Sequence, residues 1–227
     1  MNLLAIDTAA SVLSVAASAD ICAYIETEAG TRHCELVMDC IDEAVCAAGL
    51  TPNDIDGILC MGGPGSFTGL RIGFSACKGL ALALNIPFAP IPTLDCMAFG
   101  RSGLTLPVIT ARKNAFFFAL YHDGKRLLPD TDACAGQIAE VIDKYGKTTE
   151  KTALTGPGAA MLYDALPQEL KTKIDLIDEN RGYAKELIEV AKKYKIFNND
   201  NRNRLFEGPE YIRKSDAELN LIGKTGI

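Results

Sequence analysis

The chain has 227 residues, of which 48% are hydrophobic and 23% charged, a balance typical of soluble globular proteins. A chain of this length can build a hydrophobic core without disulfide bonds or a structural metal. Its net charge of −6 is uneven, because residues 1–100 carry 3 basic and 11 acidic side chains and residues 181–227 carry 10 and 7. An acidic first half argues against a free-standing RNA-binding protein, and the lack of a basic leader or long apolar run predicts a cytoplasmic protein without a membrane span.

The first half predicts a mixed sheet covered by helices. Strands are expected at residues 3–8, 12–19, 21–28, 57–61 and 88–91, and helices at 32–49, 70–85 and 93–101. Three strands joined by short turns form an antiparallel meander, and the later strands alternate with helices. This order favours an α/β lobe.

The second half predicts a smaller lobe of the same kind. Strands are expected at residues 106–111, 115–122, 153–154 and 174–177, and helices at 134–145, 158–166 and 183–194. We place the boundary near residues 100–105, which gives an N-terminal lobe of residues 1–102 and a C-terminal lobe of residues 103–227. The polar segment after Phe197 is expected to be a loop.

The eight cysteines are interpreted as reduced, buried thiols. No pair has C-x-x-C spacing, and Cys22, Cys60 and Cys77 fall inside apolar patterns. Only two histidines, His33 and His122, are present and neither has clustered partners, so we expect no zinc site and no bound metal.

A glycine-rich block follows the strand at 57–61 and precedes a helix. Backbone amides at such a helix start can bind an anion, which makes Gly63, Gly65 and Ser66 weak candidates. The block lacks the Lys-Ser/Thr pair of a P-loop, and its spacing of G-x-G-x-x-x-G misses the dinucleotide fingerprint. The glycines equally permit close backbone packing, and this is the favoured interpretation.

Two neighbouring helices carry more apolar surface than one sheet requires. In the helix at 70–85 the only charges are Arg71 and Lys78, and a band of small residues runs along another side. In the helix at 32–49 the apolar arc spans about 200°, against roughly 100° for packing on a sheet. Mutual packing of the helices explains part of the surplus, and a protein partner is predicted to cover the rest.

His33 and Glu35 near a helix start could form an acid–base pair. The alternative is structural, since a carboxylate at this position favours the helix dipole. No nucleophile or metal ligand is obviously placed beside them, so catalysis by this pair is not expected.

The segment from Arg32 to Ala81, with its core G-G-P-G-S-F-T-G-L-R-I-G, resembles the Gcp-like family, and within it the YeaZ-like branch. The motifs L-A-I-D-T-A at residues 4–9 and P-E-Y-I-R at residues 209–213 also fit. The resemblance covers the first half well and the second half sparsely.

This resemblance implies two actin-like (ribonuclease H-like) lobes, the second degenerate, and a role in making N6-threonylcarbamoyladenosine beside the tRNA anticodon. It implies a non-catalytic dimerisation subunit without a cofactor, which binds the catalytic paralogue TsaD; TsaE, an ATPase, joins them. Alone, the chain is expected to form a homodimer through the same surface, and tRNA is reached only through the complex. The candidate contacts are Leu36, Val37, Cys40, Ile41, Ala44, Arg71, Phe74, Ala76, Cys77, Lys78 and Leu82.

The catalytic paralogue holds its metal through an H-x-x-x-H pair, and the matching positions here are Thr93 and Met97. Actin-like ATPases place glycine in their phosphate turns, whereas residues 7–11 and 110–112 contain none, so side chains would block the phosphate. An actin-like ATPase or small-molecule kinase stays as the alternative function. Direct tRNA binding is a third, based only on the basic end of the chain with Lys192, Lys193 and Lys195.

Overall fold

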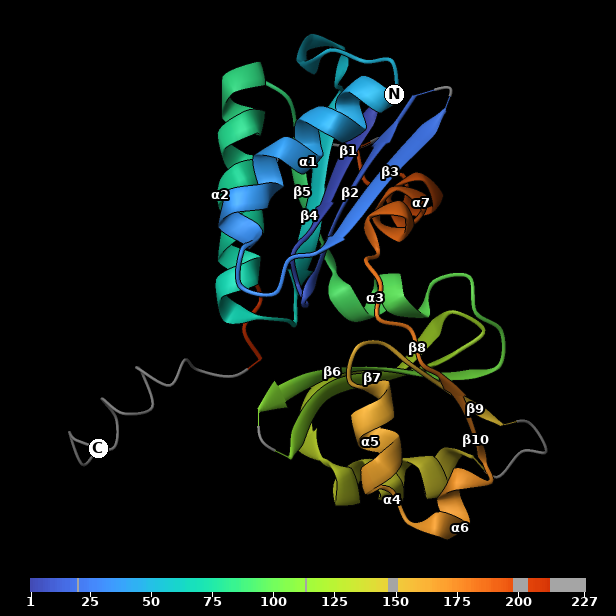
Figure 1. Cartoon of the computed structure of the whole chain (residues 1–227). Coiled ribbons are helices and arrows are strands. Elements are labelled where there is room, and N and C mark those ends of the chain that lie inside the picture. The colour runs from blue at the N-terminus through green and yellow to red at the C-terminus, as the bar shows by residue number, and fades with distance from the viewer. Residues whose placement is uncertain (20, 113, 147–150, 198–203, 213–227) are drawn as a thin grey trace, which may run out of the picture.

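The computed structural model describes residues 1–19, 21–112, 114–146, 151–197 and 204–212 as two lobes, each built on one five-stranded sheet (Figure 1). The strands of the first lobe are β1 (Leu3–Asp7), β2 (Val12–Ser18), β3 (Cys22–Glu28), β4 (Gly57–Gly63) and β5 (Phe88–Pro92). They lie in the order β3-β2-β1-β4-β5, with an antiparallel meander on one side of β1 and parallel strands on the other. Short turns suit the antiparallel strands, and the parallel pairs need helical crossovers.

Helices cover both faces of this sheet. α1 (His33–Ala47) and α2 (Phe67–Leu84) pack on one face, and α3 (Thr93–Ala98) and α7 (Ala184–Tyr194) on the other (Figure 1). α2 begins three residues before the predicted start at residue 70, because the Ser66 hydroxyl accepts a hydrogen bond from the Gly69 amide (3.2 Å) and caps the helix. A 3₁₀ turn, Pro52–Asp54, precedes β4.

The second lobe repeats the connectivity of the first. Its strands are β6 (Leu104–Arg112), β7 (Ala115–His122), β8 (Lys125–Cys134), β9 (Thr152–Thr155) and β10 (Ile174–Ile177), and its helices are α4 (Ala135–Tyr145), α5 (Ala159–Ala165) and α6 (Gln168–Lys171). The order β10-β9-β6-β7-β8 again joins a meander to two parallel strands. Two mixed sheets with this shared connectivity confirm the predicted fold class. Strand β8 and helix α6 were not predicted.

Strand β8 escapes the sequence pattern because it lies at the edge of the sheet. Most of its side chains are exposed or half-buried, and Pro129 interrupts it. An edge strand tolerates proline and charged residues, since one of its sides makes no ladder hydrogen bonds.

Helix α7 follows the second sheet in sequence but packs on the first, as Figure 1 shows. Its start is tied to the first lobe, since the Tyr183 amide donates to Asp7 Oδ2 (2.9 Å) and the Ala184 amide donates to Ser14 Oγ (3.1 Å). We therefore propose a lobe division in which residues 184–194 belong with residues 1–102.

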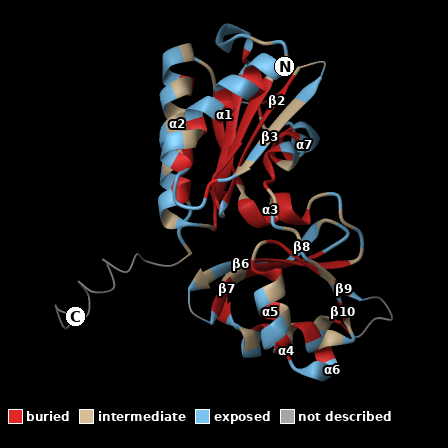
Figure 2. Ribbon diagram, in the orientation of Figure 1, coloured by how far each residue is buried: buried red, intermediate tan, exposed pale blue. Residues whose placement is uncertain are grey.

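Burial concentrates in the two sheets and in α3 (Figure 2). The cysteines are all free, but only half of them match the predicted burial: Cys40, Cys60, Cys77 and Cys96 are buried, whereas Cys22, Cys34, Cys46 and Cys134 are exposed. Cys22 is the clear correction, because it opens the exposed edge strand β3 rather than a core strand.

Candidate functional site

Helices α1 and α2 lie beside one another on the first sheet, and part of the predicted contact set faces inward. The buried members are Val37, Cys40, Ile41, Ala44, Phe74 and Cys77. They pack against the sheet and against the facing helix, so the wide apolar arc is explained in part by helix–helix contact. We therefore propose a docking surface without five of these side chains; Ile41 stays in it, because it lines the groove between the two helices.

Of the remaining members, Leu36 lies on α1 and the other four lie on α2. Arg71 and Leu82 are exposed, and Leu36, Ala76 and Lys78 are half-buried. Leu82 is 65% exposed. By length and composition α2 would suit a membrane span, yet it packs on the sheet and only 33% of its residues are buried. The outer face of α2 is therefore unusually apolar for a surface helix.

The band of small residues on α2 is divided between two faces. Gly73 is buried, and a Cβ there would collide with the Thr8 side chain, so it serves close packing inside the lobe. Gly79 is exposed, and a Cβ there would meet no atom within 4 Å. Gly79, Leu82 and Ala83 are all exposed, and we call them the exposed strip of α2.

An apolar groove of about 280 Å³ runs between α1 and α2. Met38 is 45% exposed at its edge, and Leu80 and Leu84 line it from α2. Exposed Cys46 lines it from the end of α1. Leu82 is two positions from both Leu80 and Leu84 and so projects from another side of α2; the groove and the exposed strip are therefore two separate apolar features that share this helix.

The glycine-rich loop packs tightly against the turn after β1. The Ser66 amide donates to the Ala9 carbonyl (2.8 Å), and the Gly63 amide donates to the Thr93 hydroxyl (3.2 Å). A Cβ on Gly65 would lie 2.8 Å from the Ala9 carbonyl oxygen. Two of the candidate anion-binding amides are thus engaged within the protein, which supports the close-packing interpretation.

Residues 204–212 form a segment that we call the C-terminal strap, and it lies over the same loop. The Arg204 amide donates to the Phe88 carbonyl (3.0 Å), and the Glu210 amide donates to the Gly62 carbonyl (2.7 Å). A Cβ on Gly63 would collide with the Glu210 carbonyl, so the glycine is needed for this approach. The two most family-like motifs therefore meet in space, except that Arg213 lies outside the described residues.

An aromatic stack fixes the strap to the start of α2. The Tyr211 and Phe67 rings stack with centroids 4.5 Å apart, and the Arg71 guanidinium lies 3.9 Å from the Phe67 centroid. Arg71 Nε also donates to the Tyr211 hydroxyl (3.1 Å). The sequence analysis missed this cluster, because no local spacing links residues 140 positions apart.

Asp7 sits at the end of β1, where the two lobes meet. Its Oδ1 accepts from the Ala9 amide (2.9 Å) and its Oδ2 from the Tyr183 amide. Burial raises the pKa of the Asp7 carboxyl to about 6, although these two hydrogen bonds act against the shift. Through these hydrogen bonds the Asp7 carboxylate connects the turn after β1 to the start of α7.

A cleft of about 310 Å³ opens beside this turn, where the lobes face each other. It is lined by Ala9, Ala10, Ser11, Gly30, Ser66, Ile109, Thr110 and Pro157. None of these described residues carries a charge, so no cationic side chain among them is placed to neutralise a phosphate.

The other candidates lie apart from this cleft lining. Thr93 and Met97 are buried, in α3. His33 is 5% exposed, and burial lowers the pKa of its imidazole, whereas Glu35 is exposed. Lys192, Lys193 and Lys195 lie at the end of α7, and Lys192 Nζ donates a hydrogen bond to Ser18 Oγ (3.1 Å).

Comparison with known proteins gives consistent relatives. Residues 25–220 match the family described as TsaD, tRNA N6-adenosine threonylcarbamoyltransferase. The tRNA threonylcarbamoyladenosine biosynthesis protein TsaB of Bacillus subtilis is 34% identical over 98% of both chains. TsaB of Escherichia coli is 35% identical over 53% of this chain and 55% of its own length.

Solved structures share the fold. YeaZ from Pseudomonas aeruginosa matches with a TM-score of 0.72 and 21% identity over 87% of this chain and 93% of its own. A Pseudomonas aeruginosa protein described as similar to peptidase YEAZ matches with a TM-score of 0.77 and 22% identity, covering 93% and 99%. With the fold, the motifs and a full-length relative in agreement, the chain belongs to the TsaB (YeaZ-like) branch of this threonylcarbamoyltransferase family.

Proposed function

We propose that the chain acts in the biosynthesis of threonylcarbamoyladenosine in tRNA, as a non-catalytic scaffold subunit that binds a TsaD-like paralogue. The names of its relatives support the pathway. The docking surface in this proposal consists of the exposed strip of α2 and the groove between α1 and α2. A TsaE-like ATPase joins the larger complex in the cytoplasm, and tRNA is reached through the assembled complex.

One observation carries this proposal: α2, a helix apolar enough for a membrane, keeps Leu82 65% exposed on one side and lines an open apolar groove on another. Covering one leucine side chain contributes about 1.5–3 kcal/mol, so a continuous apolar strip favours a partner. A paralogue with its own helix pair would present a complementary surface. Without it, a second copy of this chain would cover the strip through a two-fold contact.

The test is binding of the purified TsaD-like paralogue from the same organism to variants of this chain. Leu82→Asp places a charge on the strip and should weaken binding at least about tenfold. Met161→Asp is the matched control, because Met161 is 55% exposed on α5 of the second lobe. Equal affinity of the Leu82→Asp chain and the control would contradict the proposed surface.

A further inference from the structure

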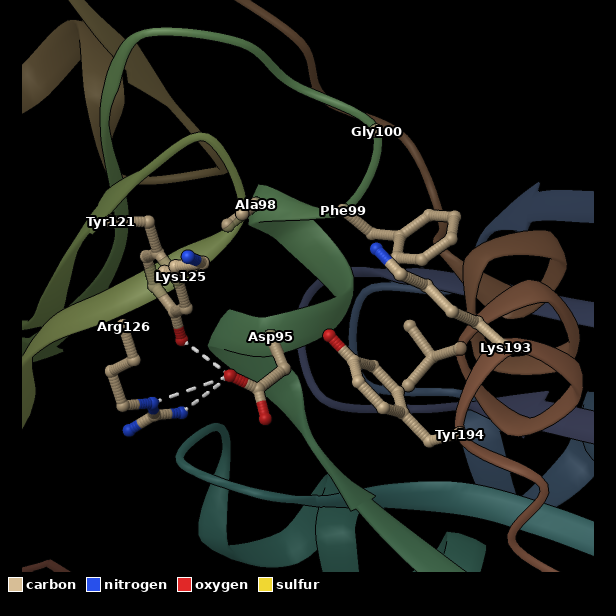
Figure 3. A pocket seen from close by; sticks show the side chains of 11 residues that line it. Asp95, Ala98, Phe99, Gly100, Tyr121, Lys125, Arg126, Lys193 and Tyr194 are labelled. Carbon is tan, nitrogen blue, oxygen red and sulfur yellow. Dashed lines mark hydrogen bonds and ion pairs between the residues drawn. The ribbon is translucent and has the colours of Figure 1, made fainter.

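Besides the groove and the interlobe cleft, a pocket lies on the side of α3 that faces the β7–β8 hairpin and α7. We call it the α3 pocket; its volume is about 360 Å³, within the usual range for small-molecule sites (Figure 3). The pocket lies between the two lobes, because α3 and α7 pack on the first sheet and the hairpin belongs to the second sheet. Three aromatic and three cationic side chains line it: Phe99, Tyr121, Tyr194, Lys125, Arg126 and Lys193.

The Asp95 carboxylate lines this pocket and accepts hydrogen bonds there. Its Oδ1 accepts from the Tyr121 hydroxyl (2.7 Å) and from Arg126 Nη2 (2.8 Å), as Figure 3 shows. Within the described part of the chain, each hydrogen bond to the Asp95 side chain goes to Oδ1. Its Oδ2 is therefore open to a donor from a ligand, and the side chain is 35% exposed.

Carboxylates inside the protein neutralise only part of the positive charge that lines the pocket. Arg126 is committed to two carboxylates, Asp95 and Asp130. Lys125 and Lys193 have no carboxylate partner among the described residues. The Lys193 ammonium instead lies over the Phe99 ring, 5.2 Å from its centroid. Two cations are thus open to an anionic ligand beside an aromatic surface.

These features fit one ligand chemistry better than a bare anion. Inorganic phosphate would pair with the lysines, but Asp95 would repel it and the aromatic rings would contribute nothing. A planar base can stack on the rings, its amino group or a ribose hydroxyl can donate to Asp95 Oδ2, and its phosphate can pair with the lysines. We propose that the α3 pocket binds a nucleoside phosphate, either a free nucleotide or an unpaired nucleotide of an RNA.

The test is an NMR titration of the full-length chain, which reports on the amides of Phe99, Tyr121 and Lys193. Adenosine 5′-monophosphate is the first probe, and a short unstructured RNA is the second. We expect saturable shifts with at least one of them, and weaker binding of inorganic phosphate and of adenosine alone. Saturation by the RNA without the mononucleotide would assign the site to RNA, and the reverse would assign it to the free nucleotide.

Charge variants test the same pocket. Lys125→Gln with Lys193→Gln should weaken binding at least about tenfold, since each lysine supplies a charge-assisted contact. Lys144→Gln is the matched control, because Lys144 also lies over an aromatic ring, 5.3 Å from the Tyr145 centroid, but on α4 outside the pocket. Absence of saturable shifts with both probes, or equal binding by the double variant and the control, would overturn the proposal.

Discussion

The substitution Gly79→Arg on α2 should change the stability of the isolated chain and its affinity for a partner in opposite directions. Gly79 is an exposed helical glycine, and nothing lies within 4 Å of a Cβ built on it. Glycine is about 0.8–1 kcal/mol less favourable than alanine inside a helix, and arginine is close to alanine. The change should therefore stabilise the isolated chain by about 0.7 kcal/mol, which raises Tm by about 2 °C for a protein of this size.

The same arginine should block the partner. On the proposed surface its charge would be buried without a counter-ion, which costs about 3 kcal/mol, a factor of about 100 in Kd. Calorimetric melting of the chain and binding to the TsaD-like paralogue measure the two effects. Gly136→Arg on exposed Gly136 of α4 is the control. A stable Gly79→Arg chain that binds the paralogue as tightly as wild type would refute the assignment of this face.

Three further expectations follow from the contacts described above. Because burial raises the pKa of Asp7 to about 6, its protonation favours the native state; this contribution is full below pH about 4 and is lost as the pH rises through 6. Relative to Asp7→Asn, wild type should lose about 2 kcal/mol of unfolding free energy between pH 4 and pH 7, and an equal pH dependence of the two unfolding free energies would contradict this. Tyr211→Ala removes the stack on Phe67, so the Glu210 amide should lose protection in hydrogen exchange; unchanged protection would mean that the backbone bonds alone hold the strap. Calorimetric titration with ATP·Mg of the Lys125→Gln, Lys193→Gln double variant, which removes the free charges of the α3 pocket, should be flat at micromolar concentrations, because no described residue lining the interlobe cleft is cationic. Saturable binding by this variant would revive the ATPase alternative.

The sequence predicts those helices and strands whose positions follow from local hydrophobic patterns. Alternating and apolar runs located most strands, and the helix at 183–194 was placed to within one residue of α7. Its packing partner could not be read from the chain, because α7 returns to the first sheet through hydrogen bonds from residues 183 and 184 to side chains of β1 and β2. The edge strand β8 was missed because its exposed positions lack a burial pattern.

The candidate site was predicted at the level of helices and less well at the level of side chains. An apolar arc of about 200° could not tell contact with the sheet and the neighbouring helix from contact with a partner. The same ambiguity holds for α2, which is apolar on most sides: Phe74 and Cys77 are core residues, whereas Leu82 is exposed. The strap was recognisable as a motif, but its position over Gly63 depends on contacts between distant residues.

The most direct test of the proposed docking surface uses the native cysteines as probes. Cys46 lines the groove between α1 and α2, whereas Cys22 is exposed on β3 and Cys134 at the end of β8. Alkylation rates are measured by mass spectrometry for the chain alone and in the complex with its TsaD-like paralogue. We expect the complex to slow the modification of Cys46 and to leave Cys22 and Cys134 unchanged. Unaltered labelling of Cys46 in a saturated complex, with protection of Cys134 instead, would place the partner on the second lobe and contradict this account.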